Sequence, residues 1–166
     1  DQDILTYLGR LPIGERERLN AELNAIELRL AADVTPAPGA AELVRSLHEQ
    51  GVQLGILTRN LRSVAFASLE HIGVIDCFAP QHVIGRDEAA PKPDPDGIHL
   101  LLNDWQLPAE DAVMVGDFHF DLSAGRNAGC QTCLILPENH WPELTDVHVT
   151  DCLELLAQLR AGRYLP

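Results

Sequence analysis

Between positions 14 and 34, apolar residues recur at helical spacing among glutamates and arginines. These apolar residues are Leu19, Leu23, Ile26 and Leu30. Because an α-helix has 3.6 residues per turn, the pattern predicts an amphipathic helix. The stretch Thr35–Gly39 contains two prolines and a glycine, which cannot continue a helix. We therefore expect a domain boundary that separates residues 1–35 from residues 36–166.

Beyond this boundary, short apolar runs alternate with amphipathic stretches. The predicted strands cover residues 52–57, 82–84, 112–115, 132–136 and 148–149. The predicted helices cover residues 40–50, 61–72, 121–128, a stretch around Ile98, Leu101, Leu102 and Trp105, and a last helix capped by Asp151. Such alternation favours an α/β fold with a doubly wound parallel sheet covered by helices on both faces. In this class, ligands bind outside the carboxyl ends of the strands.

Candidate chemistry stands at three of these strand ends, and the first is Thr58-Arg59-Asn60. Its hydroxyl, amide side chain and backbone N–H groups meet where the next helix begins, and a helix start favours an anion. A threonine or asparagine in this place also serves as a simple helix cap. The second is Lys92, which is flanked by Pro91 and Pro93. A rigid loop can hold its ammonium against a phosphate or carboxylate, although the stretch also fits a solvated turn.

The third strand end carries two carboxylates, Asp117 and Asp121, in the stretch Gly116-Asp117-Phe118-His119-Phe120-Asp121. Magnesium prefers oxygen ligands, takes one or two protein carboxylates and bridges to substrate phosphate, so we expect a Mg²⁺ site here. The alternative is that Asp121 caps its helix and Asp117 fills a turn. His119 could act as an acid or base near neutral pH, but we expect a wall or substrate contact.

The order of a hydroxyl, a lysine and an acid pair at successive strand ends resembles the haloacid dehalogenase superfamily, in particular its phosphoglycolate phosphatase-like members. The second motif of that superfamily is similar to Leu54–Asn60, the third to Lys92–Pro95 and the fourth to Val115–Asp121. The resemblance covers roughly residues 36–136. It implies a Rossmann-like core over residues 36–166 and a partial helical cap over residues 1–35.

The resemblance also implies a reaction in which an aspartate attacks a phosphomonoester, and water then hydrolyses the aspartyl-phosphate. Thr58, with the backbone near Arg59 and Asn60, would bind the phosphoryl oxygens, and Lys92 would neutralise the nucleophile and the phosphate. Asp117 would bind Mg²⁺ directly. Asp121 would act through a metal-bound water or orient Lys92. The expected substrate is a small phosphorylated metabolite, for example phosphoglycolate or a sugar phosphate.

The first motif of the superfamily, a strand ending in an aspartate pair that supplies the nucleophile, has no counterpart in the sequence. The only similar spacing, Asp1-Gln2-Asp3, lacks a preceding strand and opens a helix-like stretch. We expect the natural protein to carry an additional N-terminal segment, because a missing central strand would leave buried backbone groups unpaired. Two other functions stay open: a catalytically inactive module that binds phosphate or metal, and a phosphomutase.

Composition narrows the range of partners. A net charge of −13 disfavours nucleic acids and anionic membranes, and no apolar run is long enough to span a bilayer. We expect a soluble cytoplasmic protein with no nucleic-acid or membrane partner, and the sequence leaves the oligomeric state open. Of the four cysteines, Cys130 and Cys133 have the spacing of a metal or redox pair. We expect a structural role for them, because no second Cys or His pair accompanies them.

Overall fold

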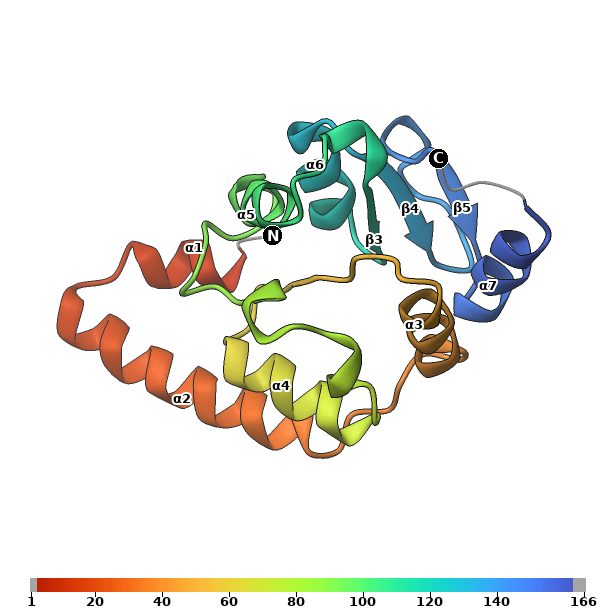
Figure 1. Cartoon of the computed structure of the whole chain (residues 1–166). Coiled ribbons are helices and arrows are strands. Elements are labelled where there is room, and N and C mark those ends of the chain that lie inside the picture. Colours follow the sequence, from red (N-terminus) through yellow and green to blue (C-terminus); the bar gives the residue numbers. More distant parts are fainter. Residues whose placement is uncertain (1–2, 163–166) are drawn as a thin grey trace.

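The computed structural model describes residues 3–162, in which helices and strands alternate as predicted (Figure 1). The helices are α1 (Ile4–Gly9), α2 (Ile13–Ala31), α3 (Ala40–Glu49), α4 (Arg62–His71), α5 (Asp96–Trp105), α6 (His119–Ala128) and α7 (Cys152–Arg160). The strands are β1 (Ile56–Leu57), β2 (Val83–Ile84), β3 (Val113–Gly116), β4 (Gln131–Ile135) and β5 (Val147–Val149).

All strand pairs are parallel, which confirms the predicted α/β class, but the strands form two separate sheets. One sheet contains β1 and β2, and the other has the order β3-β4-β5. No ladder joins β1 to β3 within the described residues. The strands that face this break are incompletely covered, since Val115 on β3 is 38% exposed. A strand in the interior of a doubly wound sheet is normally buried on both faces.

Helices cover both faces of the β3-β4-β5 sheet because successive strand residues point to opposite sides. On one face, α3 and α7 enclose Cys133 of β4 and Val149 of β5, which are 0% and 1% exposed. On the other face, α5 and α6 pack together over Met114 of β3. A separate apolar cluster lies between α4 and Val83 of β2. These layers place the carboxyl ends of β1 and β3 beside the loops that carry the predicted site.

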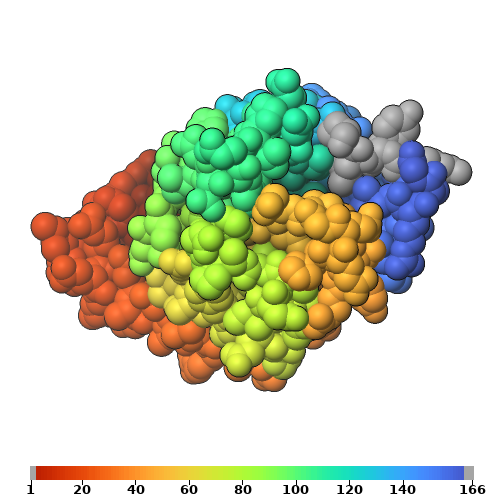
Figure 2. All heavy atoms as spheres, viewed as in Figure 1, coloured from red at the N-terminus to blue at the C-terminus, as the bar shows by residue number. Residues whose placement is uncertain are grey.

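Helices α1 and α2 form one end of the molecule, and α7 lies at the opposite end (Figures 1 and 2). The predicted α2 helix is confirmed, but its predicted apolar face is wrong in part: Ile26 and Leu30 are 45% and 67% exposed. Instead, Glu27 of α2 accepts hydrogen bonds of 2.8 and 2.9 Å from Arg86, which follows β2. This buried ion pair turns a polar side of α2 toward the core.

Two smaller differences from the predicted elements concern boundaries. Strand β1 covers only residues 56–57 of the predicted 52–57, and α6 begins at His119 rather than at Asp121. The earlier start places Asp121 in the first turn of α6. Asp3 accepts a hydrogen bond from the Thr6 amide and caps α1, as expected for a helix start, whereas Asp1 lies outside the described residues. Within residues 3–162, no helix combines the length and apolarity needed to cross a bilayer.

Candidate active site

Lys92 joins the two sheets at the carboxyl ends of their strands. Its Nζ donates a hydrogen bond of 2.7 Å to the Leu57 carbonyl at the end of β1. The same Nζ lies 2.6 Å from Oδ1 of Asp121 in α6, the helix that follows β3. Lys92 is 9% exposed and Asp121 is 7% exposed, so this is a buried ion pair. The loop with two prolines therefore holds the lysine between the end of β1 and the first turn of α6.

The Asp121 carboxylate uses both oxygens within the protein. Oδ1 accepts from Lys92, and Oδ2 accepts a hydrogen bond of 3.0 Å from the backbone N–H of Phe118. Gly116 at the end of β3 makes room for this arrangement, since a Cβ at that position would lie 2.3 Å from the Asp121 Cβ. Of the roles expected for Asp121, the geometry favours orientation of Lys92.

Hydrogen bonds of Thr58 hold the turn after β1. Thr58 extends the pairing of β1 with β2 through a backbone hydrogen bond of 2.9 Å to Ile84. Its Oγ1 accepts a hydrogen bond of 3.1 Å from the Asn60 amide, so the hydroxyl and the turn hold each other in place. Thr58 is half-buried and Asn60 is exposed. The hydroxyl group remains able to donate a proton to a bound anion.

Arg59 makes contacts that the sequence did not indicate. Its guanidinium donates to the Lys92 carbonyl and to the carboxylate of Asp3, and lies 4.4 Å from the ring centroid of Phe120. Burial alone raises the pKa of Asp3, but hydrogen bonds from Arg59 and Thr6 outweigh it and hold that pKa below its usual value. Arg59 thus links the site loop to α1. A cavity of about 270 Å³ lies among these residues.

Asp117 differs from Asp121 because its side chain is exposed, with no hydrogen bond or ion pair to any other described residue. An exposed carboxylate beyond the end of β3 is a suitable ligand for Mg²⁺, which keeps several waters and needs only one or two protein carboxylates. Residues 3–162 contain no group of three or more His, Cys, Asp or Glu side chains placed to share a metal ion.

The buried cysteines fit the expected structural role. All four are free thiols inside the protein. Burial, together with the neighbouring Cys152, raises the pKa of Cys133 to about 12, and burial also raises the pKa of Cys130. Thiols with raised pKa values are poor nucleophiles and poor metal ligands.

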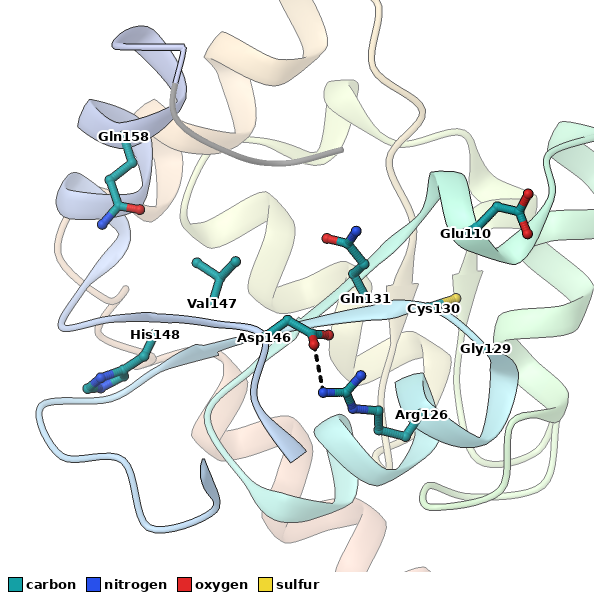
Figure 3. Close-up of a pocket in the computed structure, with 9 residues that line it drawn as sticks. All are labelled: Glu110, Arg126, Gly129, Cys130, Gln131, Asp146, Val147, His148 and Gln158. Atoms are coloured by element: carbon teal, nitrogen blue, oxygen red, sulfur yellow. Dashed lines mark hydrogen bonds and ion pairs between the residues drawn. The ribbon is translucent and has the colours of Figure 1, made fainter. Parts of the chain in front are cut away.

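A second cavity, of about 660 Å³, lies at the opposite end of the strands, where β4 and β5 begin (Figure 3). Arg126 and Asp146 in its wall form an ion pair of 2.7 Å. Asp146 also accepts a hydrogen bond of 2.9 Å from the amide of Thr132, and the same Oδ2 lies 3.1 Å from the Thr132 hydroxyl. Burial alone raises the pKa of Asp146, but these bonds hold it below its usual value. No predicted site residue lies here.

The family comparison agrees with the order of the motifs. The sequence profile of the haloacid dehalogenase-like hydrolases matches residues 2–135. The chain therefore belongs to this family, and the predicted membership in a family of hydrolytic enzymes is confirmed.

Known proteins are similar over different shares of their length. An uncharacterized hydrolase of Saccharomyces cerevisiae is 26% identical over 93% of the chain and 74% of its own length. The pyrophosphatase PpaX of Halalkalibacterium halodurans is 35% identical over 61% of the chain, which corresponds to 47% of that protein. The crystal structure of a hydrolase from Pseudomonas syringae superposes with a TM-score of 0.81 at 22% identity, covering 96% of the chain and 77% of that structure. This likeness confirms the fold.

Proposed function

We propose that the protein is a magnesium-dependent phosphomonoester hydrolase that acts on a small phosphorylated metabolite through an aspartyl-phosphate intermediate. The observation that carries the proposal is the position of Lys92, whose Nζ contacts both the Leu57 carbonyl and the Asp121 carboxylate. A buried ammonium at this point neutralises negative charge that gathers between the ends of β1 and β3. The name of the PpaX relatives, pyrophosphatases, supports chemistry at phosphorus.

In the proposed reaction, Thr58 and Lys92 stabilise the phosphoryl group that is transferred. The Thr58 hydroxyl and the backbone N–H groups of Arg59 and Asn60 donate hydrogen bonds to its oxygens, and Lys92 balances their charge. Asp121 keeps the lysine ammonium in position through the contact of 2.6 Å. Since Asp121 is itself held by the Phe118 amide, the lysine has little freedom to move away.

Magnesium would be held by Asp117, whose exposed carboxylate has no other partner among the described residues. When bound, the ion neutralises negative charge on phosphate oxygens and helps to align them. Asp121 would contribute through a metal-bound water or only through Lys92.

The nucleophile of the proposed reaction would be an aspartate at the end of a strand that pairs between β1 and β3, a strand that residues 3–162 do not contain. The break between the two sheets and the exposure of Val115 on β3 support this position. The carboxylate oxygen would attack phosphorus as the bond to the leaving-group oxygen breaks, and that oxygen would take up a proton to leave as an alcohol. Water would then attack phosphorus and give up a proton, which releases inorganic phosphate and regenerates the carboxylate. An aspartate at the end of such a strand would lie beside Lys92.

The same break favours a second candidate function. Without a strand between β1 and β3, Thr58, Lys92 and Asp117 could still bind a phosphate or a metal ion without transferring a phosphoryl group. The protein would then be a binding module with a regulatory role. Turnover distinguishes the two functions.

The test is hydrolysis of p-nitrophenyl phosphate by the natural protein, together with any residues that flank the printed sequence. The rate is measured with Mg²⁺, with EDTA, and for Asp117→Ala. Asp111→Ala is the matched control, because Asp111 is also exposed but lies before β3 rather than after it. We expect turnover that requires Mg²⁺, falls by about 10²-fold or more in Asp117→Ala and persists in Asp111→Ala.

Two results would contradict the hydrolase proposal. Equal loss of activity in both aspartate variants would mean that net charge, rather than a metal ligand, explains the effect. A folded protein that binds Mg²⁺ or phosphate but releases no p-nitrophenol, and no phosphate from small metabolites, would support the binding module.

A further inference from the structure

Aromatic rings form a continuous row beside the candidate site. The row consists of Phe118, His119, Phe120 and Trp141, which come from the start of α6 and from the connection between β4 and β5. The ring centroid of Phe118 lies 5.3 Å from that of Phe120 and 5.5 Å from that of Trp141. His119 lies 4.2 Å from Phe120 and 5.7 Å from Trp141. The guanidinium of Arg59 extends the row beyond Phe120.

This aromatic row is not part of the hydrophobic core. None of its members belongs to the three apolar clusters of the described residues, and Phe118 is 46% exposed. Exposed apolar surface gathered in one place typically marks a binding site. Phe118 directly follows Asp117, and its backbone N–H holds Asp121. The row therefore lies next to the groups that we propose to bind phosphate and metal.

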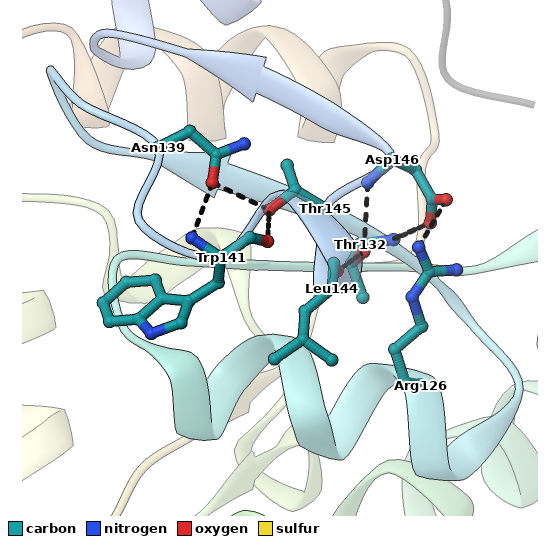
Figure 4. A network of polar contacts seen from close by, with 7 residues as sticks. All are labelled: Arg126, Thr132, Asn139, Trp141, Leu144, Thr145 and Asp146. Carbon is teal, nitrogen blue, oxygen red and sulfur yellow. Dashed lines mark hydrogen bonds and ion pairs between the residues drawn. The ribbon is translucent and has the colours of Figure 1, made fainter.

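The loop that carries Trp141 is held rigidly by polar contacts (Figure 4). The Trp141 amide donates a hydrogen bond of 2.9 Å to Oδ1 of Asn139, and the Trp141 carbonyl accepts one of 2.8 Å from the Thr145 hydroxyl. The hydroxyl of Thr132 on β4 donates a hydrogen bond of 2.5 Å to the Leu144 carbonyl in the same loop. Figure 4 shows the indole over the end of α6 that lies opposite Arg126. The backbone that carries the ring is thus held in place before any ligand arrives.

We propose that the aromatic row binds a planar ring in the leaving group of the substrate. This inference rests on the proposed function and names its substrate class: a phosphomonoester that carries a planar ring, such as a nucleoside 5′-monophosphate. Its phosphate would lie near Lys92 and Thr58, and its ring would stack on Phe118 or Trp141. Stacking of a base on one aromatic side chain strengthens binding by a factor on the order of ten.

The test compares adenosine 5′-monophosphate with ribose 5-phosphate, in which a hydroxyl group takes the place of the base. Steady-state phosphate release with Mg²⁺ gives kcat/KM for each. We expect the natural protein to prefer adenosine 5′-monophosphate by about tenfold, with most of the difference in KM. Phe118→Leu keeps the apolar bulk but removes the ring, so the ratio should fall toward one. Phe118→Tyr should restore the ratio, and Trp141→Leu should lower it.

The ratio of the two kcat/KM values is an internal control, because a variant that is merely unstable loses activity toward both substrates together. Equal kcat/KM for the two substrates in the natural protein, or an unchanged ratio in Phe118→Leu and Trp141→Leu, would overturn the inference and leave the proposed hydrolase intact. Absence of phosphate release from both substrates and from p-nitrophenyl phosphate would overturn the proposed function and the inference together.

Discussion

The two ends of the strands use similar residue types in different ways. At the amino ends of β4 and β5, Thr132, Arg126 and Asp146 satisfy one another through hydrogen bonds and an ion pair (Figures 3 and 4). At the carboxyl ends of β1 and β3, Lys92 and Asp121 are also paired, but the neighbouring Asp117 is exposed and has no partner among the described residues.

The difference separates structural polar groups from candidate functional ones. A network in which each charge has a partner inside the protein stabilises the fold and leaves little capacity for a ligand. An exposed carboxylate without a partner, such as Asp117, leaves an interaction for a substrate or its metal ion to complete. Substitutions at the two ends should therefore have different consequences for stability and for activity.

The largest effect on stability should come from Lys92→Met. This change leaves the Asp121 carboxylate buried at 7% exposure without its cation. Removing one partner of a buried ion pair typically costs about 3–5 kcal/mol, so we expect a loss of that order in the free energy of unfolding, together with loss of turnover. Urea denaturation of the purified variant measures the first effect.

The double variant Lys92→Met/Asp121→Leu is the control, because it removes the stranded charge as well. We expect it to recover a large part of the lost stability while remaining inactive. A loss below about 1 kcal/mol in Lys92→Met would show that the ion pair contributes no more than an exposed one.

At the other end of the strands, Asp146→Ala should reduce stability but preserve catalysis. The change removes the acceptor of the Thr132 amide, and Thr132 is 0% exposed. An unsatisfied buried donor costs about 1–3 kcal/mol. Arg126→Met, which removes only the partly exposed ion pair, should cost less than about 1 kcal/mol. If Asp146→Ala abolished turnover in protein that remains folded, the contrast between the two ends would be wrong.

At alkaline pH, Cys133 should lower the stability of the fold. Its pKa is raised to about 12, whereas a thiol in the unfolded chain titrates near about 8.5. The contribution of the neutral thiol to the free energy of unfolding is therefore complete below about pH 8.5. It is lost as the pH rises toward the pKa in the folded protein, and the free energy of unfolding falls by roughly 1 kcal/mol over the first pH unit. Cys133→Ala should show a smaller decline between about pH 8.5 and 9.5 in urea denaturation. An identical decline in both proteins would contradict the assignment.

The smallest effect should appear at acid pH, where Asp3 and Asp146 have lowered pKa values. Their contribution to stability is present above the usual carboxyl pKa of about 3.9 and is lost as the pH falls through the folded values. Asp3→Asn should therefore flatten the dependence of stability on pH below about pH 4. NMR titration of the side-chain carboxyl groups would measure both pKa values directly, and an ordinary value for Asp3 would argue against its contact with Arg59.

Much of the fold could be predicted because local patterns determine it. The helical spacing of Leu19 and Leu23 predicts α2, Asp151 caps α7 as expected, and the short apolar runs coincide with β2 to β5. The exposure of Ile26 and Leu30 could not be predicted in this way. The orientation of α2 depends on Glu27, whose partner Arg86 is 59 residues away along the chain.

The sequence predicted at which strand ends the residues of the candidate site lie, but it did not predict which side chains are in contact there. Thr58, Lys92 and Asp117 stand where the rule for parallel sheets places ligands, and their order along the chain identified the family. The partners of Arg59 and the ring contacts of Trp141 carry no local signal. They join segments that are distant in sequence, so only the folded chain brings them together.

By itself, the sequence determined which segments form helices and strands and which residue types end each strand, because periodicity and turn residues act over a few positions. Only the tertiary structure decided that Asp121 is buried against Lys92 while Asp117, four residues earlier, is exposed. The physical reason is that burial and pairing depend on packing between elements. The first turn of α6 rotates one carboxylate toward the lysine, and the end of β3 leaves the other outside.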